Sequence, residues 1–175
     1  LFRRSGTVVG NTVGSAPSLA RRVAWALVAV LLLGTVAGVV LMRRWSVPAP
    51  GSAPYEQVTR AFYHGLAALE VGLLDDARQS FAQCTVLVPA EPAAWVNLGV
   101  SALRLGDYDV ASQALTKAAD LLPRSSAIAM TRGQLDMTRG RVDEGIAFFR
   151  TAVSVDAANV RARFALAQEV ERGEI

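Results

Sequence analysis

The sequence predicts an all-α protein, and two features of its 175 residues carry this prediction. The first is a run of 20 residues without a charge, at positions 23–42. The second is a 34-residue period that begins near residue 58, along which small and large apolar residues return to the same positions. Together they predict one apolar N-terminal helix followed by an array of helix pairs.

The 34-residue period is marked by residues suited to helix packing and helix ends. Glycines recur at two positions of each period, one for close helix contact and one for a turn: Gly65, Gly99, Gly133 and Gly72, Gly106, Gly140. Large apolar residues recur at Phe81, Leu115 and Phe149. Carboxylates recur where the second helix of each pair would begin, near the positive end of its dipole: Asp75, Asp109 and Asp143. Three repeats are therefore predicted at 58–91, 92–125 and 126–159.

The central unit, 92–125, resembles the tetratricopeptide (TPR) repeat, a 34-residue helix–turn–helix. The residue types of that family stand at relative positions 4, 7, 8, 20, 24, 27 and 32, namely Trp95, Leu98, Gly99, Ala111, Leu115, Ala118 and Pro123. Ala102 occupies position 11, where Tyr is commonest. The resemblance implies an α-solenoid of three repeats. Residues 160–172 start a fourth unit, and their polar composition predicts a C-terminal capping helix; a longer protein cut at residue 175 is the alternative.

Residues 23–42 are expected to cross a membrane as a single helix. Twenty residues at 1.5 Å each span about 30 Å, the thickness of the hydrocarbon core. Arginine pairs bracket the run, and Trp25 and Trp45 lie near its ends, where indoles are favoured. Gly34 and Gly38 form a G-x-x-x-G pattern that suits packing on another membrane helix, although apolar segments also contain it by chance. A cleavable signal peptide is the alternative, but its apolar region is typically shorter.

These features divide the chain into four parts. We expect an N-terminal tail at 1–20, a transmembrane helix at 21–45, a linker at 46–54 and a TPR domain at 55–175. The linker carries three prolines in nine residues and is expected to form neither helix nor sheet. Four arginines precede the apolar run and two follow it, which predicts a cytoplasmic N-terminus and repeats on the other side of the membrane. The architecture resembles membrane-anchored bacterial TPR proteins, which implies the inner membrane and periplasmic repeats.

Composition excludes several classes of function. The formal net charge is +3, but six arginines and no acid lie in the first 44 residues. Residues 55–175 hold 12 basic and 15 acidic residues, a net charge of −3, so no nucleic-acid partner is expected. His64 is the only histidine and Cys84 the only cysteine, and both are expected to be packing residues, His64 partly buried. No catalytic, metal or cofactor set is found, so neither an enzyme nor a small-molecule substrate is expected.

The resemblance also implies a binding surface, because the first helices of TPR repeats line a concave groove that holds a peptide or helix. Asn97 is assigned to this groove, and positions 5, 9 and 12 of each unit assign nine more residues to it: Phe62, Leu66, Leu69, Val96, Val100, Leu103, Met130, Gln134 and Met137. Eight of these nine are apolar, as at many interaction sites; the alternative is that some pack inside the superhelix. A subgroup of the family binds chaperone C-termini, but of the slots it uses (Phe62, Leu66, Asn97, Ala127, Thr131) only Asn97 matches.

The function expected from these features is that of a membrane-anchored scaffold or accessory subunit. Its partners would be the lipid bilayer and other protein subunits of a membrane complex. One alternative is a transient periplasmic assembly factor or chaperone-like adaptor, of the secretion or cytochrome-maturation type. Another is the anchor and adaptor of a longer protein whose active domain lies beyond residue 175.

Overall fold

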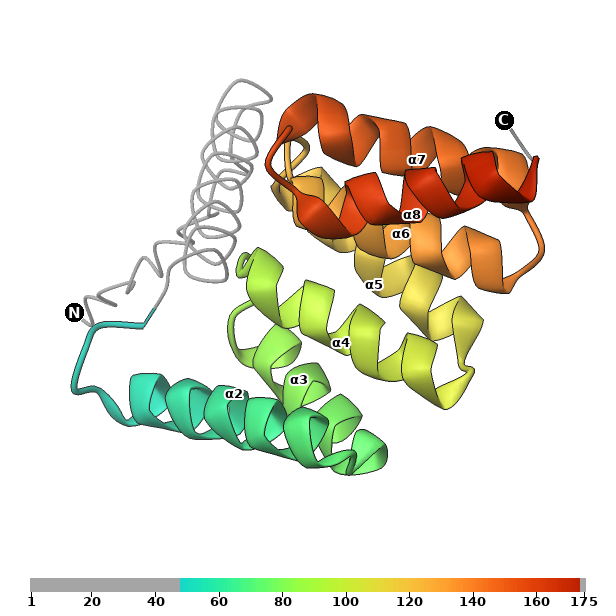
Figure 1. Cartoon of the computed structure of the whole chain (residues 1–175). Helices are drawn as coiled ribbons and strands as arrows, with labels where there is room; N and C mark the ends of the chain where they lie inside the picture. The colour runs from blue at the N-terminus through green and yellow to red at the C-terminus, as the bar shows by residue number, and fades with distance from the viewer. Residues whose placement is uncertain (1–47, 174–175) are drawn as a thin grey trace, which may run out of the picture. The chain divides into compact units, whose positions relative to one another are not determined.

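The computed structural model describes residues 48–173, which are entirely helical apart from turns (Figure 1). The all-α prediction is confirmed for this part of the chain. The predicted transmembrane helix, with Gly34 and Gly38, lies outside the described residues. Within 48–173 no helix is both long enough and apolar enough to span a bilayer. The helices are α2 (Ala53–Val71), α3 (Leu74–Leu87), α4 (Pro92–Leu105), α5 (Tyr108–Leu121), α6 (Ser126–Thr138), α7 (Val142–Val155) and α8 (Val160–Arg172).

Helix α2 begins earlier than the sequence predicted. Its N-cap is Ser52, whose hydroxyl accepts a hydrogen bond from the backbone N–H of Tyr55 at 3.3 Å. Ala53 and Pro54 therefore belong to the helix rather than to the predicted linker. The expectation that residues 46–54 exclude helix is wrong at this end, because proline is tolerated in a first helical turn, where its missing N–H has no intrahelical partner.

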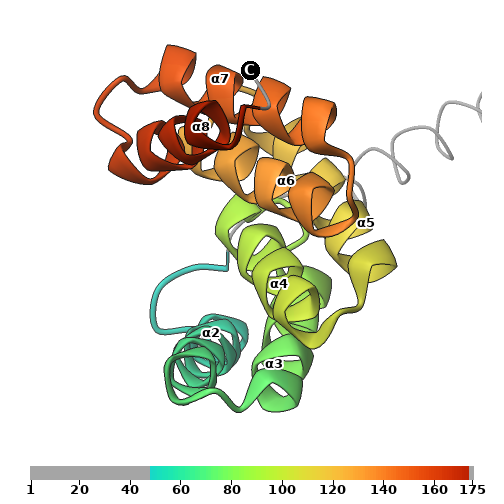
Figure 2. The ribbon, with the colours of Figure 1, turned by 45° about the vertical axis from the view of Figure 1, so that its right-hand side comes forward.

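The helices form three consecutive pairs, α2–α3, α4–α5 and α6–α7, and α8 packs on α7 (Figures 1 and 2). Each pair is stacked on the next through α3–α4 and α5–α6 contacts. The turn inside each pair contains a glycine with a φ of +76° to +81°, a conformation that side-chain-bearing residues rarely adopt. These glycines are the predicted turn residues Gly72, Gly106 and Gly140.

The helices of each pair approach closely where the sequence placed its second set of glycines. A Cβ atom added at Gly99 would lie 2.8 Å from Leu115, and one added at Gly65 would lie 2.9 Å from Phe81. The third pair is tighter, since a Cβ at Gly133 would lie 2.5 Å from the Phe149 ring. The absence of a side chain at these positions therefore sets the distance between the paired helices.

A hydrophobic cluster joins the first two repeats. Trp95 on α4 packs against buried Ala68, Phe81 and Leu98, and its indole Nε1 donates a hydrogen bond to the carbonyl oxygen of Pro89 at 2.8 Å. Because this cluster contains residues from α2 through α5, the repeats share one core rather than forming separate units.

Candidate functional site

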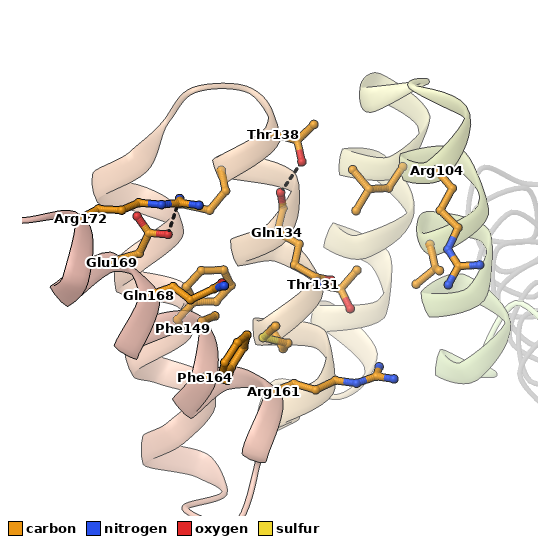
Figure 3. Close-up of a pocket in the computed structure, with 15 residues that line it drawn as sticks. Arg104, Thr131, Gln134, Thr138, Phe149, Arg161, Phe164, Gln168, Glu169 and Arg172 are labelled. Atoms are coloured by element: carbon orange, nitrogen blue, oxygen red, sulfur yellow. Dashed lines mark hydrogen bonds and ion pairs between the residues drawn. The ribbon is translucent and has the colours of Figure 1, made fainter. Parts of the chain in front are cut away.

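A cavity of about 780 Å³ lies between α4, α6 and α8 (Figure 3). Its apolar lining comes from Val100, Leu103, Met130, Met137, Phe149, Phe164 and Ala165. Its polar lining comes from Arg104, Thr131, Gln134, Thr138, Arg161, Gln168, Glu169 and Arg172. The cavity is thus built from the first helices of the second and third repeats and from the C-terminal helix.

Half of the residues assigned to the groove from the sequence line this cavity. They are Val100, Leu103, Met130, Gln134 and Met137. Gln134 is exposed, whereas Met130 is 8% exposed and packs against Phe149 in the core of the third repeat. Met130 therefore serves both as a core residue and as part of the cavity floor.

The first repeat does not line this cavity, although three of the predicted groove residues belong to that repeat. Phe62, Leu66 and Leu69 are partly buried and pack against the cluster shared by the first two repeats. The Phe62 ring meets the Phe81 ring edge to face, with centroids 5.8 Å apart. The large aromatic at Phe81 fills the space between α2 and α3, and Phe62 packs on it, as the alternative of packing inside the superhelix describes. The groove assignment of these three residues stays a prediction.

The two predicted groove residues at the start of α4 also lie outside the cavity. Val96 and Asn97 are partly buried, and neither lines the cavity between α4, α6 and α8. The backbone carbonyl of Asn97 accepts a hydrogen bond from the hydroxyl of Ser101 at 2.9 Å. The cavity therefore uses only the C-terminal half of α4.

Helix α8 lines the cavity, whereas the sequence predicted for it only the role of a cap. This helix supplies Arg161, Phe164, Ala165, Gln168, Glu169 and Arg172. The signal was available, because Phe164 and Gln168 stand at positions 5 and 9 of the incomplete fourth unit, the positions used for the other repeats. Phe164 remains 63% exposed, the most exposed large apolar side chain of the lining.

The charges around the cavity are predominantly positive. Three arginines, Arg104, Arg161 and Arg172, face a single carboxylate, Glu169. The Glu169 side chain is 5% exposed and accepts a bond from Arg172 Nη1 at 2.9 Å, so its charge is compensated within α8. Arg161 is exposed and makes no ion pair with any residue in the described part of the chain.

Arg104 is positioned by the neighbouring repeat. Its Nη1 donates a hydrogen bond to the backbone carbonyl of Leu69 on α2, at 3.3 Å. This contact holds the side chain near the end of α4 without neutralising its charge. The cavity therefore presents an apolar floor with cationic groups from two of its three helices (Figure 3).

The other chemically distinctive residues have structural roles. His64 is exposed rather than partly buried, and its Nδ1 lies 3.0 Å from the Ser80 hydroxyl. The equivalent Leu98 is covered by the preceding repeat, whereas no described helix precedes α2. Cys84 is buried in the core beside Ala61 and Ala94, and burial raises the pKa of its thiol. Neither residue forms part of the cavity.

A smaller cavity of about 140 Å³ borders α5 and α6. Its Asp136 carboxylate is 10% exposed and accepts hydrogen bonds from the Arg141 guanidinium. Since the partly exposed Arg141 satisfies this buried carboxylate, the pair stabilises the turn after α6 and the Asp136 carboxylate is not free for a ligand.

Comparison with known proteins identifies the fold. Residues 63–126 match the sequence profile of the tetratricopeptide repeat. Comparison with curated protein sequences gives no significant match.

Among solved structures, similarity extends over about two thirds of the chain. The type III secretion translocator chaperone SycD of Yersinia enterocolitica matches with a TM-score of 0.64 and 16% identity, over 73% of this chain and 100% of that one. The Arabidopsis OM64 TPR domain matches with a TM-score of 0.62 and 22% identity, over 66% and 96%. The second TPR domain of human RPAP3, in complex with an HSP70 peptide, matches with a TM-score of 0.61 and 20% identity, over 66% and 97%. Residues 63–126 thus match the tetratricopeptide repeat family by sequence, and the described part of the chain has its fold.

Proposed function

We propose that this chain is a protein-interaction adaptor that binds a segment of a partner protein in the cavity between α4, α6 and α8. The observation that carries the proposal is the exposure of Phe164, at 63%, beside a floor of methionine and aliphatic side chains. Exposed aromatic residues at the centre of an apolar surface often supply much of the binding energy at interfaces. Methionine side chains adapt to partners of different shape.

The lining favours a protein segment over a small molecule. Small-molecule sites combine an enclosed apolar space with a few convergent polar groups that fix orientation. Here the only buried charged group of the lining, Glu169, is already paired with Arg172. The remaining polar side chains come from three different helices and surround the apolar floor, as at the rim of a protein interface.

The structural neighbours support binding of protein partners in general terms. The matching RPAP3 domain is in complex with the HSP70 peptide SGPTIEEVD, and SycD is a translocator chaperone. The likeness to SycD favours the second candidate function, a transient assembly factor. Stoichiometric recovery with a complex after detergent extraction indicates a stable subunit, whereas substoichiometric recovery indicates an assembly factor.

The proposal places the repeats at a membrane. Its support is the sequence of residues 23–42, an uncharged run of bilayer length between arginine pairs. In this proposal the run anchors the chain with its N-terminus in the cytoplasm, and the repeats bind a subunit of a membrane complex on the other side. A reporter enzyme fused after residue 175 tests the orientation: activity of a reporter that works only in the cytoplasm would reverse it.

Two matched variants on α8 test the binding site. Phe164→Asp places a charge in the cavity, whereas Val170→Asp places the same charge on a 57% exposed residue of α8 that does not line it. Proteins recovered with the full chain from detergent-extracted membranes are quantified by mass spectrometry. We expect Phe164→Asp to reduce recovery of the partner at least tenfold, about 1.4 kcal/mol, and Val170→Asp to leave it unchanged. Equal recovery by both variants, each with wild-type circular dichroism, would exclude this cavity as the contact surface.

A further inference from the structure

We infer that the segment bound in this cavity is acidic and amphipathic, and that its acidic side chains are recognised along its length rather than at a free C-terminus. This inference rests on the proposed function and specifies its ligand. The occupant is a stretch of a partner protein that carries apolar residues on one side and several carboxylates on the other.

The charge distribution supports an acidic occupant. Residues 55–175 carry a net charge of −3, yet the cavity carries three arginines and one carboxylate, and that carboxylate is paired with Arg172. A cationic cavity on an otherwise acidic domain attracts acidic segments and repels basic ones, which provides selectivity as well as faster association. The remaining acidic surface of the domain repels an acidic segment, so the cavity is the part of the domain where such a segment is favoured.

The spacing of the cations indicates an extended contact. Arg161 and Arg172 lie near opposite ends of α8, and eleven helical residues correspond to a rise of about 16 Å. A single terminal carboxylate cannot contact both ends of this helix. Figure 3 shows the Arg161 side chain at one end of the cavity and the Arg172–Glu169 pair at the other, with Phe164 and Phe149 between them. Carboxylates spaced along a segment match this arrangement, with an apolar residue placed against Phe164.

The positions that bind a chaperone C-terminus in other members of this fold do not offer such a site here. The corresponding slots hold Phe62 and Leu66, which pack on the core, and Ala127 and Thr131, which carry no charge. Thr131 donates its hydroxyl hydrogen bond to the carbonyl of Ala127, at 2.9 Å. The cations of this chain come instead from the end of α4 and from α8.

The experiment selects ligands by their chemistry. Random 16-residue peptides displayed at the N-terminus of a phage coat protein have no free C-terminus, so they present internal segments only. They are panned on the immobilised full chain at low salt, and the enriched pool is sequenced. We expect a pool with net negative charge and apolar residues spaced three or four apart. Raising the salt concentration should reduce its capture, since exposed charge interactions are screened.

Charge reversal provides the matched control. Arg161→Glu reverses a cation of the cavity, whereas Arg163→Glu makes the same change on an exposed residue of α8 that does not line it. Arg161→Glu should lower capture of the acidic pool about tenfold and, when panned separately, should enrich a more basic pool. Arg163→Glu should behave like the wild type. Both residues are exposed, so neither change is expected to unfold the helix.

The outcomes separate the inference from the proposed function. A neutral or basic pool, or an acidic pool captured equally by the wild type and Arg161→Glu, overturns the inference. If Phe164→Asp still abolishes capture in that case, the proposed function stands. If Phe164→Asp captures the pool as well as the wild type does, both the inference and the proposed function are overturned. The same conclusion follows if no peptide is enriched over beads without protein.

Discussion

The closest helix contact in the structure gives a quantitative test of the fold. Gly133 on α6 faces Phe149 on α7, and a Cβ at this glycine would lie 2.5 Å from two ring carbons and 3.0 Å from the carbonyl oxygen of Gly145. The Phe149 ring is 3% exposed, and the Gly145 carbonyl oxygen is part of the α7 backbone and cannot shift without its helix. Gly133→Ala therefore requires α6 and α7 to move apart.

The expected cost follows from two opposing terms. Overpacking of a core typically costs about 1–3 kcal/mol, and the overlap with both a buried ring and a backbone oxygen places this substitution near 3 kcal/mol. Alanine is better than glycine in a helix interior by about 1 kcal/mol, which offsets part of that cost. We expect Gly133→Ala to lower the free energy of unfolding by about 2 kcal/mol. The reverse change at exposed Ala147 on α7, Ala147→Gly, measures the propensity term alone.

The measurement is urea unfolding of the full chain, followed by circular dichroism at 222 nm. Phe149→Ala supplies the second half of a double-mutant cycle, because it removes the ring that the new methyl group would meet. In that background Gly133→Ala should stabilise the protein by about 1 kcal/mol rather than destabilise it. Destabilisation of the same size in both backgrounds, or a Gly133→Ala protein as stable as the wild type, would refute the close contact between α6 and α7.

Three further predictions concern single interactions. Trp95→Phe keeps most of the ring but loses the hydrogen bond to Pro89, so chemical unfolding should show a loss of about 1 kcal/mol; no change would mean that water replaces the bond. Asp109, 88% exposed, pairs with Arg139 across the second and third repeats, and a double-mutant cycle should give less than 1 kcal/mol, decreasing with salt. Burial raises the pKa of Cys84, so the folded protein favours the neutral thiol. Its stability should therefore fall as the pH rises above about 9, and Cys84→Ala should remove that fall; an identical pH profile for both proteins would contradict it.

The repeat architecture could be predicted because each of its determinants is local. Gly99 and Leu115 are 16 residues apart in one unit, and their contact recurs at Gly65–Phe81 and Gly133–Phe149. A glycine just after the end of the first helix of each pair gives the reversal its positive φ. Both features depend only on residue type and spacing within 34 residues. The start of α2 at Ala53 was missed because three nearby prolines suggested a linker, although Ser52 supplies an N-cap.

The candidate site could be predicted only in part, because the exposure of each predicted residue depends on which helices pack against it in the folded structure. Position 5 is occupied by Phe62, Val96, Met130 and Phe164, and the same position has four different environments. Phe62 packs on Phe81, Val96 is partly buried outside the cavity, Met130 rests on Phe149, and Phe164 is exposed. The environments of Phe62 and Met130 depend on the aromatic ring between the paired helices, Phe81 or Phe149. Such contacts are made in the folded structure and cannot be read from position 5 alone.

The C-terminal helix explains why the cavity lies at one end of the array. A helix at the end of a solenoid covers the last repeat with one face and leaves the opposite face without a partner helix. In α8 the covering face contains buried Ala162, whereas Glu169 is buried at the cavity, where its carboxylate is paired with Arg172. The side of α8 next to α6 carries Phe164 and Arg161, and no further helix follows among the described residues to cover them. The helix that closes the core of the third repeat thereby supplies the aromatic ring and the charge on which the proposed recognition depends.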